Sequence, residues 1–266
     1  MARAALLLAL LPAASRAGAG SAPVAGPSAA PPGPAAEYSV EAGPGARELR
    51  VEASFAEVPP GGLVFDDGMG RFARDVELRA GKTWKAAGLD EDALAAGACR
   101  RPCRVRYRFL LDEAARASRD RTSAFEQGGA LVASPAAWLV RPGRRGPGRF
   151  RLQVTTPAGL TFATGLFPAG RGGYEAALAD LPEAPYSAFG PFENARVDVA
   201  GGEVEVALLP GDTGVDRAAL MGWVERAAGD VAAYYGAFPV PRALVIVIPG
   251  GRRAVGYGTT MGNGGA

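Results

Sequence analysis

Residues 104–111 read RVRYRFLL, and this stretch decides the fold class. Val105, Tyr107 and Phe109 alternate with three arginines, so apolar and charged side chains point to opposite faces of an extended chain. The same alternation occurs in ELRVEASF at 48–55 and in RFRLQVTT at 149–156. A period of two is typical of half-buried antiparallel strands. The sequence therefore predicts a mainly β protein.

Turn-forming residues separate these runs. Clusters of Gly, Pro and Asp, which favour tight turns, occur as PPGG at 59–62, DDGMG at 66–70 and RPGRRGPG at 141–148. Further strand candidates are DVELRA, GLTFATGL and ARVDVAG. Seven or more short strands with such turns predict a β-sandwich or a saddle-shaped sheet, here over residues 37–202.

The pattern changes near residue 203. EVEVALLP at 203–210 is strand-like, and a helical period then places one apolar stripe on Leu220, Val224, Ala227, Val231, Tyr235 and Phe238. Asp216 is expected to cap the start of this helix, and Gly236 to end it. The apolar run ALVIVIP follows. We expect residues 203–266 to begin an α/β domain that is not completed before Ala266, as in a truncated gene product.

The N-terminus predicts export. MARAALLLALLPAASRAGAGSA combines an early arginine, a short apolar stretch and a small-residue cleavage site, so residues 1–19 are expected to be a signal peptide. The apolar stretch is too short for a stable membrane anchor. Residues 20–36 are rich in Pro, Gly and Ala and are expected to form a linker. The alternative for the N-terminus is a buried helix. On the signal-peptide interpretation the protein is periplasmic or secreted, with no integral membrane segment after signal removal.

The two cysteines, Cys99 and Cys103, frame the sequence CRRPC. In an oxidising compartment such a close pair most simply forms a structural disulfide. The alternative is a redox centre, which usually has the spacing C-x-x-C at the start of a helix. Here the spacing is longer and a strand follows, so we expect a structural disulfide.

Charge gives little indication of a partner. The chain of 266 residues has a formal net charge of +2, and the two lysines, Lys82 and Lys85, are far outnumbered by arginines. So small a net charge does not indicate a nucleic-acid partner. Arg104, Arg106 and Arg108 would form an anion-binding ladder in one interpretation, but their alternation with apolar residues favours a solvated strand face.

The chain contains no histidine. A Ser-His-Asp or Cys-His site is therefore excluded, as is a zinc site with histidine ligands. The chain also lacks the P-loop motif. Asp66 and Asp67 are adjacent carboxylates, but neighbouring residues of a strand point to opposite faces, and before Gly68 they are typical of a turn. From its residues alone, the chain shows no catalytic or metal site.

A resemblance adds an expectation. The stretch AAYYGAFPVPRALVIVIPGGRRAVGYGTTMGNGGA at 232–266 resembles a segment of the thermolysin-like (gluzincin) metallopeptidases, in particular their glycyl-aminopeptidase-like and peptidase MA-like branches. In these proteins a helix ends in a Tyr-rich turn with G-x-F-P-x-P, followed by an apolar strand and a Gly-rich edge strand. SPAAWLVRPG and TTPAGLTFATGL are similar to the β-rich N-terminal domain of such peptidases.

The resemblance implies a function for the full-length parent. Zinc would be held by an H-E-x-x-H motif and a downstream Glu, and the edge strand would align an extended peptide or protein substrate. The substrate-binding residues in this sequence would be Tyr257, Gly258, Gly262, Asn263, Gly264 and Gly265. The alternative for this segment is a glycine-rich hairpin without a ligand.

The zinc motif is absent from the chain, so the chain alone is expected to be inactive, as the N-terminal part of an exported zinc-dependent peptidase. A different hypothesis is a non-catalytic periplasmic β-sandwich module for binding or adhesion. A third is a histidine-free glycosidase, which requires two carboxylates facing each other across a cleft.

Overall fold

The computed structural model describes residues 33–57, 61–94, 99, 101–118, 123–250, 255–256 and 258–261. The expected signal peptide and most of the expected linker lie outside these residues. The first strand, β1 (Ala36–Ala42), begins at the last residue of that linker. None of the helices in the described residues is both long and apolar enough to cross a membrane.

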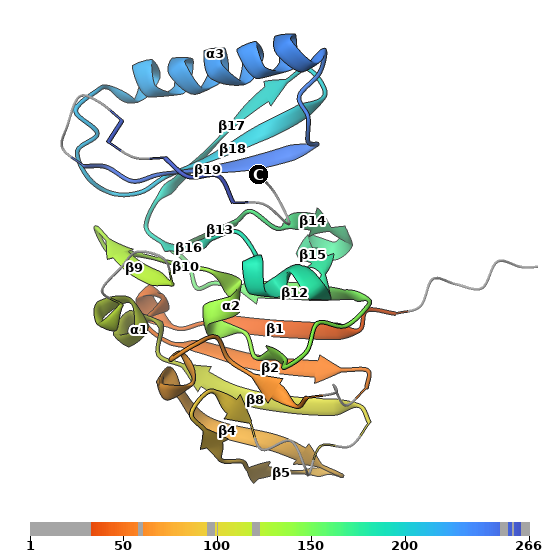
Figure 1. Cartoon of the computed structure of the whole chain (residues 1–266). Coiled ribbons are helices and arrows are strands. Elements are labelled where there is room, and N and C mark those ends of the chain that lie inside the picture. Colours follow the sequence, from red (N-terminus) through yellow and green to blue (C-terminus); the bar gives the residue numbers. More distant parts are fainter. Residues whose placement is uncertain are drawn as a thin grey trace, which may run out of the picture. The chain divides into compact units, whose positions relative to one another are not determined.

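A large sheet dominates the part of the chain before residue 190 (Figure 1). Among the described residues it has eight strands in the order β14-β15-β12-β1-β2-β8-β4-β5. In chain order these strands are β1 (Ala36–Ala42), β2 (Leu49–Phe55), β4 (Ala73–Ala80), β5 (Thr83–Ala86), β8 (Cys103–Phe109), β12 (Arg149–Thr155), β14 (Phe167–Ala169) and β15 (Gly173–Ala177). The predicted mainly β fold is therefore confirmed.

The alternation in the sequence becomes burial on one face of this sheet. In β8 the residues Cys103, Val105, Tyr107 and Phe109 are buried, and the intervening arginines are exposed or half-buried. β2 pairs with β8 in an antiparallel register that places Val51 opposite Tyr107. Because strand side chains alternate with a period of two, this register brings apolar residues together on the same face. The strands around 48–55, 104–111 and 149–156 were thus correctly predicted.

Two small sheets pack around the large one. Among the described residues, each has four strands, in the orders β13-β16-β10-β9 and β11-β3-β7-β6. Their strands are β3 (Leu63–Val64), β6 (Leu89–Asp90), β7 (Ala93–Leu94), β9 (Ala124–Gln127), β10 (Ala130–Ala133), β11 (Arg141–Pro142), β13 (Thr161–Thr164) and β16 (Ser187–Gly190). Together with the large sheet they enclose a core whose largest fully buried side chains include Trp138, Tyr38, Phe55, Phe109, Phe150 and Phe189.

Two buried tyrosine hydroxyls hydrogen-bond to the backbone of residues 138–140. Tyr38 donates to the carbonyl of Val140 at 2.9 Å, and Tyr107 donates to the carbonyl of Trp138 at 2.9 Å. The Tyr107 hydroxyl also accepts from the Val140 N–H at 2.9 Å. Burial, as the main cause, raises the pKa of both phenols above the ordinary tyrosine value.

Short helices connect the sheets. α1 (Leu111–Ala117) follows β8 directly, so the strand expected over 104–111 ends at Phe109 and Leu111 already belongs to a helix. α2 (Pro135–Trp138) starts after Ser134, whose hydroxyl accepts from the Ala136 N–H. The 3-10 helices are η1 (Pro44–Ala46), η2 (Gly70–Phe72), η4 (Gly170–Gly172) and η5 (Leu178–Glu183).

A separate sheet forms in the C-terminal part. Among the described residues it contains three strands, β17 (Glu193–Val199), β18 (Gly202–Leu208) and β19 (Arg242–Val247). β17, which the sequence predicted as part of the N-terminal sandwich, instead forms an antiparallel hairpin with β18. The reason is the tight turn at Gly201, whose φ of 92° suits a residue without a Cβ and folds β18 directly back on β17. The described residues from Pro34 onward belong to one compact unit, so the domain boundary at 202/203 stays a prediction.

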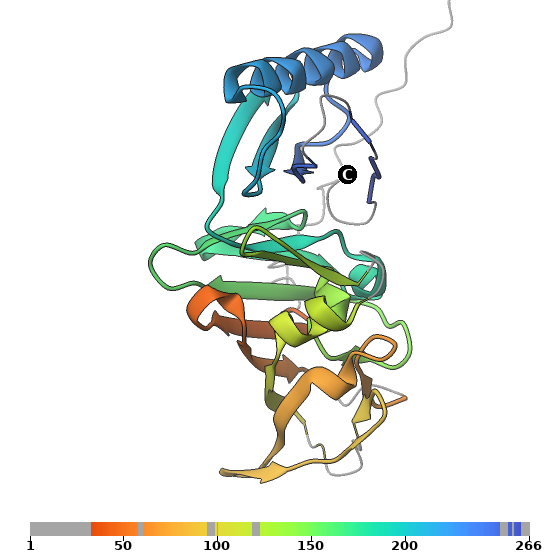
Figure 2. The same cartoon turned by 90° about the vertical axis from the view of Figure 1, so that its left-hand side faces the viewer.

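The helix α3 (Arg217–Tyr235) lies across one face of this sheet (Figures 1 and 2). Its predicted ends are confirmed. Asp216 Oδ1 accepts from the Ala219 N–H at 2.8 Å, and Gly236 ends the helix with a left-handed φ of 83°.

The predicted apolar stripe of α3 coincides with the buried face only in part. Of its members, Val224 is buried and Leu220 is half-buried, whereas Val231 and Tyr235 are 37% and 67% exposed. The other buried residues of the helix are Ala228 and Ala232, which lie outside the predicted stripe. Ala is small, so two alanines at a spacing of four let the helix approach the sheet closely, and the larger residues then lie beside the contact.

Candidate functional site

Among the described residues, the C-terminal sheet has β19 at one edge. β19 pairs with β18 in a parallel register that runs from Glu203 opposite Arg242 to Leu208 opposite Val247. β18, α3 and β19 form a strand–helix–strand unit, the usual connection between parallel neighbours. Within the part of the chain that the structure describes, β19 is one of the two outermost strands of its sheet, and β17 is the other. An outermost strand presents backbone N–H and C=O groups to which an extended peptide can pair.

Arg242, the first residue of β19, anchors this edge. Its side chain is only 7% exposed, and Nη1 donates to the carbonyls of Thr164 and Leu166 at 2.9 and 3.0 Å. Nη2 donates to Glu205 Oε2 at 2.5 Å, and Glu203 Oε1 lies 3.8 Å from Nε. The guanidinium therefore connects the carboxylates of β18 with the backbone at the end of β13.

The partners of Arg242 are themselves fixed. The buried Ser187 hydroxyl donates to Thr164 Oγ1 at 2.9 Å, which ties β16 to β13 directly below the anchor. Tyr174 lies close enough to Glu205 and Arg242 for both charges to affect its pKa. Burial raises the pKa of Tyr174, the negative charge of Glu205 raises it further, and Arg242 opposes these effects. β19 is thus held by a charged contact that is largely removed from water.

The contacts of Arg242 were not predicted from the sequence. A signal was present. Arg242 is the lone charged residue between Asp230 and Arg252, and it stands at the start of the apolar run ALVIVIP. Glu203 and Glu205 alternate with valines in β18, so both carboxylates lie on one face of that strand. An isolated charge in one apolar strand, together with two same-face carboxylates in another strand, is the pattern of a buried ion pair.

The predicted substrate-binding segment is described only in part. Gly258 is exposed, belongs to no strand, and a Cβ there would meet nothing within 4 Å. The described residues 255–256 and 258–261 are not in a strand, so the expected edge strand is not seen in them. The other predicted substrate-binding residues, Tyr257, Gly262, Asn263, Gly264 and Gly265, lie outside the described residues, and their role stays a prediction.

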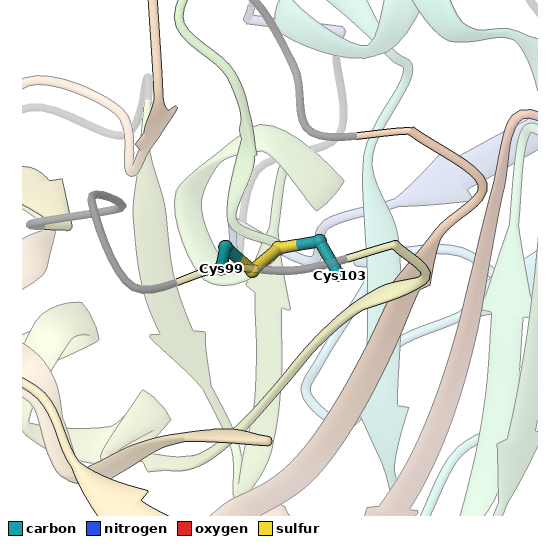
Figure 3. Close-up of a disulfide and its surroundings, with 2 residues drawn as sticks. All are labelled: Cys99 and Cys103. Atoms are coloured by element: carbon teal, nitrogen blue, oxygen red, sulfur yellow. A yellow bond between two sulfur atoms is a disulfide. The ribbon is translucent and has the colours of Figure 1, made fainter. Parts of the chain in front are cut away.

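The two cysteines form a disulfide (Figure 3). Their Cα atoms are 5.2 Å apart, and Cys103 is fully buried at the first position of β8, opposite Phe55. No cysteine remains free, since the chain has two in all. The bond links Cys99 to the first residue of β8, which lies between β2 and β4 in the large sheet.

The carboxylates Asp66 and Asp67 lie in a turn, as the sequence indicated. Asp66 is 3.2 Å from Arg141, and the turn itself is held by Asp92, whose two carboxylate oxygens accept from the N–H groups of Gly68 and Gly70 at 2.7 and 2.6 Å. Asp66 and Asp92 therefore have structural partners.

The arginines of β8 lie on the solvated face of the large sheet. Arg106 pairs with Glu77 at 2.5 Å, and Arg108 pairs with Glu48 and Asp75 at 2.6 Å each. The bonds to Asp75 and Glu48 raise the pKa of Arg108, which stays charged. The arginines thus match acidic neighbours across the strands, which agrees with the interpretation as a solvated face.

The residues of this chain do not fit a zinc ion. Among the described residues, no three His, Cys, Asp or Glu side chains converge in a way that could hold a metal. The chain has no histidine, and the disulfide occupies both thiols.

Comparison with known proteins gives a fold match. No protein-family model matches the sequence, and no curated protein does. Among solved structures, the chain is similar to an aminopeptidase N family protein from Idiomarina loihiensis, with a TM-score of 0.59 at 8% identity. The match covers 79% of this chain and 38% of the Idiomarina chain.

A second solved structure is aminopeptidase A from Legionella pneumophila in complex with aspartic acid. It matches with a TM-score of 0.48 at 10% identity, over 79% of this chain and 28% of that chain. The chain thus spans well under half the length of the solved structures that it matches. At these identities the likeness to the Idiomarina protein shows the fold, which is that of the β-rich N-terminal part of an aminopeptidase.

Proposed function

We propose that this chain is the N-terminal part of an exported zinc-dependent peptidase of the gluzincin type. It supplies the scaffold and a substrate-aligning edge. The observation that carries the proposal is the fold likeness to an aminopeptidase N family protein, which extends over 79% of the chain. A fold alone does not specify an activity, and the second support is the open edge of β19 at the C-terminal end of that fold.

In this proposal the large and small β-sheets position the edge, and β19 recognises the substrate. An extended peptide would add to the sheet beside β19 or beside the segment 257–265 that follows it. Backbone hydrogen bonds would align the peptide whatever its side chains. Glycines such as Gly258 carry no side chain, so a substrate backbone can approach them closely.

The anchor at Arg242 gives this edge a fixed place. Because Arg242 bonds to the backbone of residues 164 and 166, a peptide bound at β19 would be held at a constant position relative to the β-rich part. Such rigidity favours catalysis, since reaction rates depend steeply on how well a substrate is oriented.

Zinc binding falls to residues outside this chain. A gluzincin holds zinc with two histidines and a glutamate, and the metal activates a water molecule for attack on the peptide bond. The residues described above offer no such ligand set. The 266-residue chain is accordingly proposed to be inactive by itself, with the zinc ligands in the polypeptide that follows Ala266.

Export to the periplasm or the medium forms part of the same proposal. The disulfide between Cys99 and Cys103 supports it, because disulfides persist mainly in oxidising compartments. The apolar start of the sequence, over residues 1–19, supports it from the sequence side.

The experiment uses the protein encoded by the complete reading frame. Peptide hydrolysis is expected to disappear on treatment with a chelator and to return on addition of zinc, and the 266-residue chain is expected to show none. Activity that persists in the chelator, or activity of the 266-residue chain, would contradict the proposal.

A matched pair of variants tests the substrate segment. Gly258→Val should raise KM for a peptide several-fold while kcat changes little, because it obstructs the approach of the substrate backbone. Gly256→Val is the control. Both glycines are exposed, with nothing within 4 Å of an added Cβ, but Gly256 lies outside the predicted substrate-binding set. Equal KM values for the two variants would remove Gly258 from the site.

A further inference from the structure

A small pocket lies between the turn after β11 and the 3-10 helix η5. Its cavity volume is about 240 Å³, below the range of about 300–1,000 Å³ that is usual for drug-sized ligands. Three arginines, Arg141, Arg144 and Arg145, line one side, and Leu178 and Pro182 line the other. We refer to this cavity as the arginine pocket. It is built entirely from residues outside the proposed peptide-binding edge.

The backbone around the arginine pocket is tightly held. Arg141 and Pro142 pair with Val64 and Leu63 in the sheet. The Gly143 N–H donates to the carbonyl of Gly62 at 3.0 Å. A Cβ on Gly143 would lie only 2.5 Å from the carbonyl oxygen of Gly61, so only glycine allows the turn to pack this closely. The arginines therefore project from a rigid base.

The pocket has more positive charge than its partners neutralise. Arg141 Nη2 is 3.2 Å from Asp66, and Arg145 forms an ion pair with Glu183. Within the described ranges, Arg144 forms no ion pair. Two carboxylates thus face three guanidinium groups, which leaves about one positive charge at the mouth of the cavity.

Arg141 also has an unsatisfied donor. Its side chain is 18% exposed, and its Nε is buried without a hydrogen-bond partner in the described structure. A buried donor without a protein acceptor is unfavourable. The guanidinium fork of arginine matches the oxygen spacing of phosphates and carboxylates, so the ligand best suited to this arginine-rich lining is an oxyanion.

We propose that the arginine pocket binds a compact oxyanion of the phosphate class, either as the free ion or as a phosphate group on a small molecule. The excess charge attracts the anion, the guanidinium groups of Arg141 and Arg144 donate to its oxygens, and the small volume excludes large ligands. This site is independent of peptide hydrolysis, and its test does not depend on the proposed function.

The test is titration calorimetry of the 266-residue chain with inorganic phosphate at constant ionic strength, with chloride as the balancing salt. Saturable binding is expected, with a dissociation constant below about 10 mM. Binding that does not saturate in this range, or that chloride reproduces, would overturn the proposal. A phosphate monoester titrated in parallel separates the two forms of the ligand, since a group on a small molecule should bind at least as tightly as the free ion.

Charge variants locate the site. Arg144→Gln should weaken phosphate binding roughly tenfold, because a charge-assisted hydrogen bond is lost. Glu183→Gln should strengthen it several-fold, because Arg145 then loses its competing carboxylate. Arg104→Gln is the control, since Arg104 is an exposed arginine of β8 that does not line the pocket. Equal weakening by Arg104→Gln and Arg144→Gln, or no strengthening in Glu183→Gln, would contradict the site.

Discussion

The β-rich part and the C-terminal α/β part place their apolar residues differently. In the large sheet, Phe55, Phe109 and Phe150 are fully buried, and the charged residues between them face solvent. In α3, Trp223 is 50% exposed and Tyr234 is 82% exposed. A large sheet packed against two smaller ones encloses its side chains, whereas three strands and one helix have too little surface to cover all of theirs. Equally apolar sequence thus leads to a closed core in one region and an open surface in the other.

The largest expected contrast lies between core and surface aromatics. Phe109→Ala should lower the free energy of unfolding by about 3–5 kcal/mol, since it empties a fully buried site beside Phe65 and Phe72. Trp223→Ala should change it by less than about 1 kcal/mol. Chemical denaturation of both variants measures the difference. Equal losses would show that α3 buries its aromatics as well as the sheet does.

The next largest effect is expected at Arg242, which connects the C-terminal sheet to the backbone of residues 164 and 166. Arg242→Ala should cost about 3 kcal/mol, because it leaves Glu203 and Glu205 without their buried partner. The matched control is Arg196→Ala, which removes an exposed arginine that also pairs with Glu203, and little change is expected there. Hydrogen exchange of β19 amides in Arg242→Ala should speed up relative to those of β8. Unchanged exchange in β19 would mean that Arg242 does not hold the edge.

High pH should weaken the β-rich core first. The pKa values of Tyr38 and Tyr107 are raised by burial, so above pH about 10 the unfolded chain releases phenolic protons that the native protein retains. The free energy of unfolding is therefore unaffected by these phenols below pH about 10, and above that pH it falls by about 1.4 kcal/mol per pH unit for each tyrosine. Denaturation at several alkaline pH values measures the slope.

Tyr38→Phe is the control for that slope. The variant lacks one of the three phenols whose pKa is raised by burial, Tyr38, Tyr107 and Tyr174, so its stability should fall less steeply with pH, even though it is less stable at neutral pH through the loss of the hydrogen bond to Val140. An identical slope in the two proteins would contradict the assignment to Tyr38.

The smallest expected effect concerns the start of α3. Asp216→Ala removes the acceptor for the Ala219 N–H and should cost about 1 kcal/mol. Asp216→Asn keeps an acceptor at that position and should cost less. Thermal unfolding of both variants gives the difference, and an effect of Asp216→Asn as large as that of Asp216→Ala would show that the cap does not depend on the side-chain oxygen.

Local patterns in the sequence predicted local features well. Alternation over 104–111 predicted β8, and Asp216 and Gly236 predicted the two ends of α3, because strand burial and helix capping depend on residues close in sequence. α1 was missed, since seven residues directly after a strand are too few to establish a helical period.

Features that depend on distant partners were harder to predict. β17 was assigned to the wrong sheet, because a strand pattern does not specify its neighbour. The buried face of α3 depends on close approach at Ala228 and Ala232, which hydrophobicity does not reveal. The role of Arg242 depends on carbonyls 76 and 78 residues earlier in the chain. The sequence did not indicate the contact that anchors β19, and the role of the segment 257–265 stays a prediction.

The central claim is that this chain begins a zinc peptidase, and the most direct measurement is the genomic DNA sequence immediately 3′ of the codon for Ala266. The proposal predicts an open frame that runs within a few tens of codons into H-E-x-x-H, with a glutamate further on, as zinc ligation in this class requires. A stop codon at that position would contradict the proposal, and the chain would then be a histidine-free β-sandwich module for binding or adhesion.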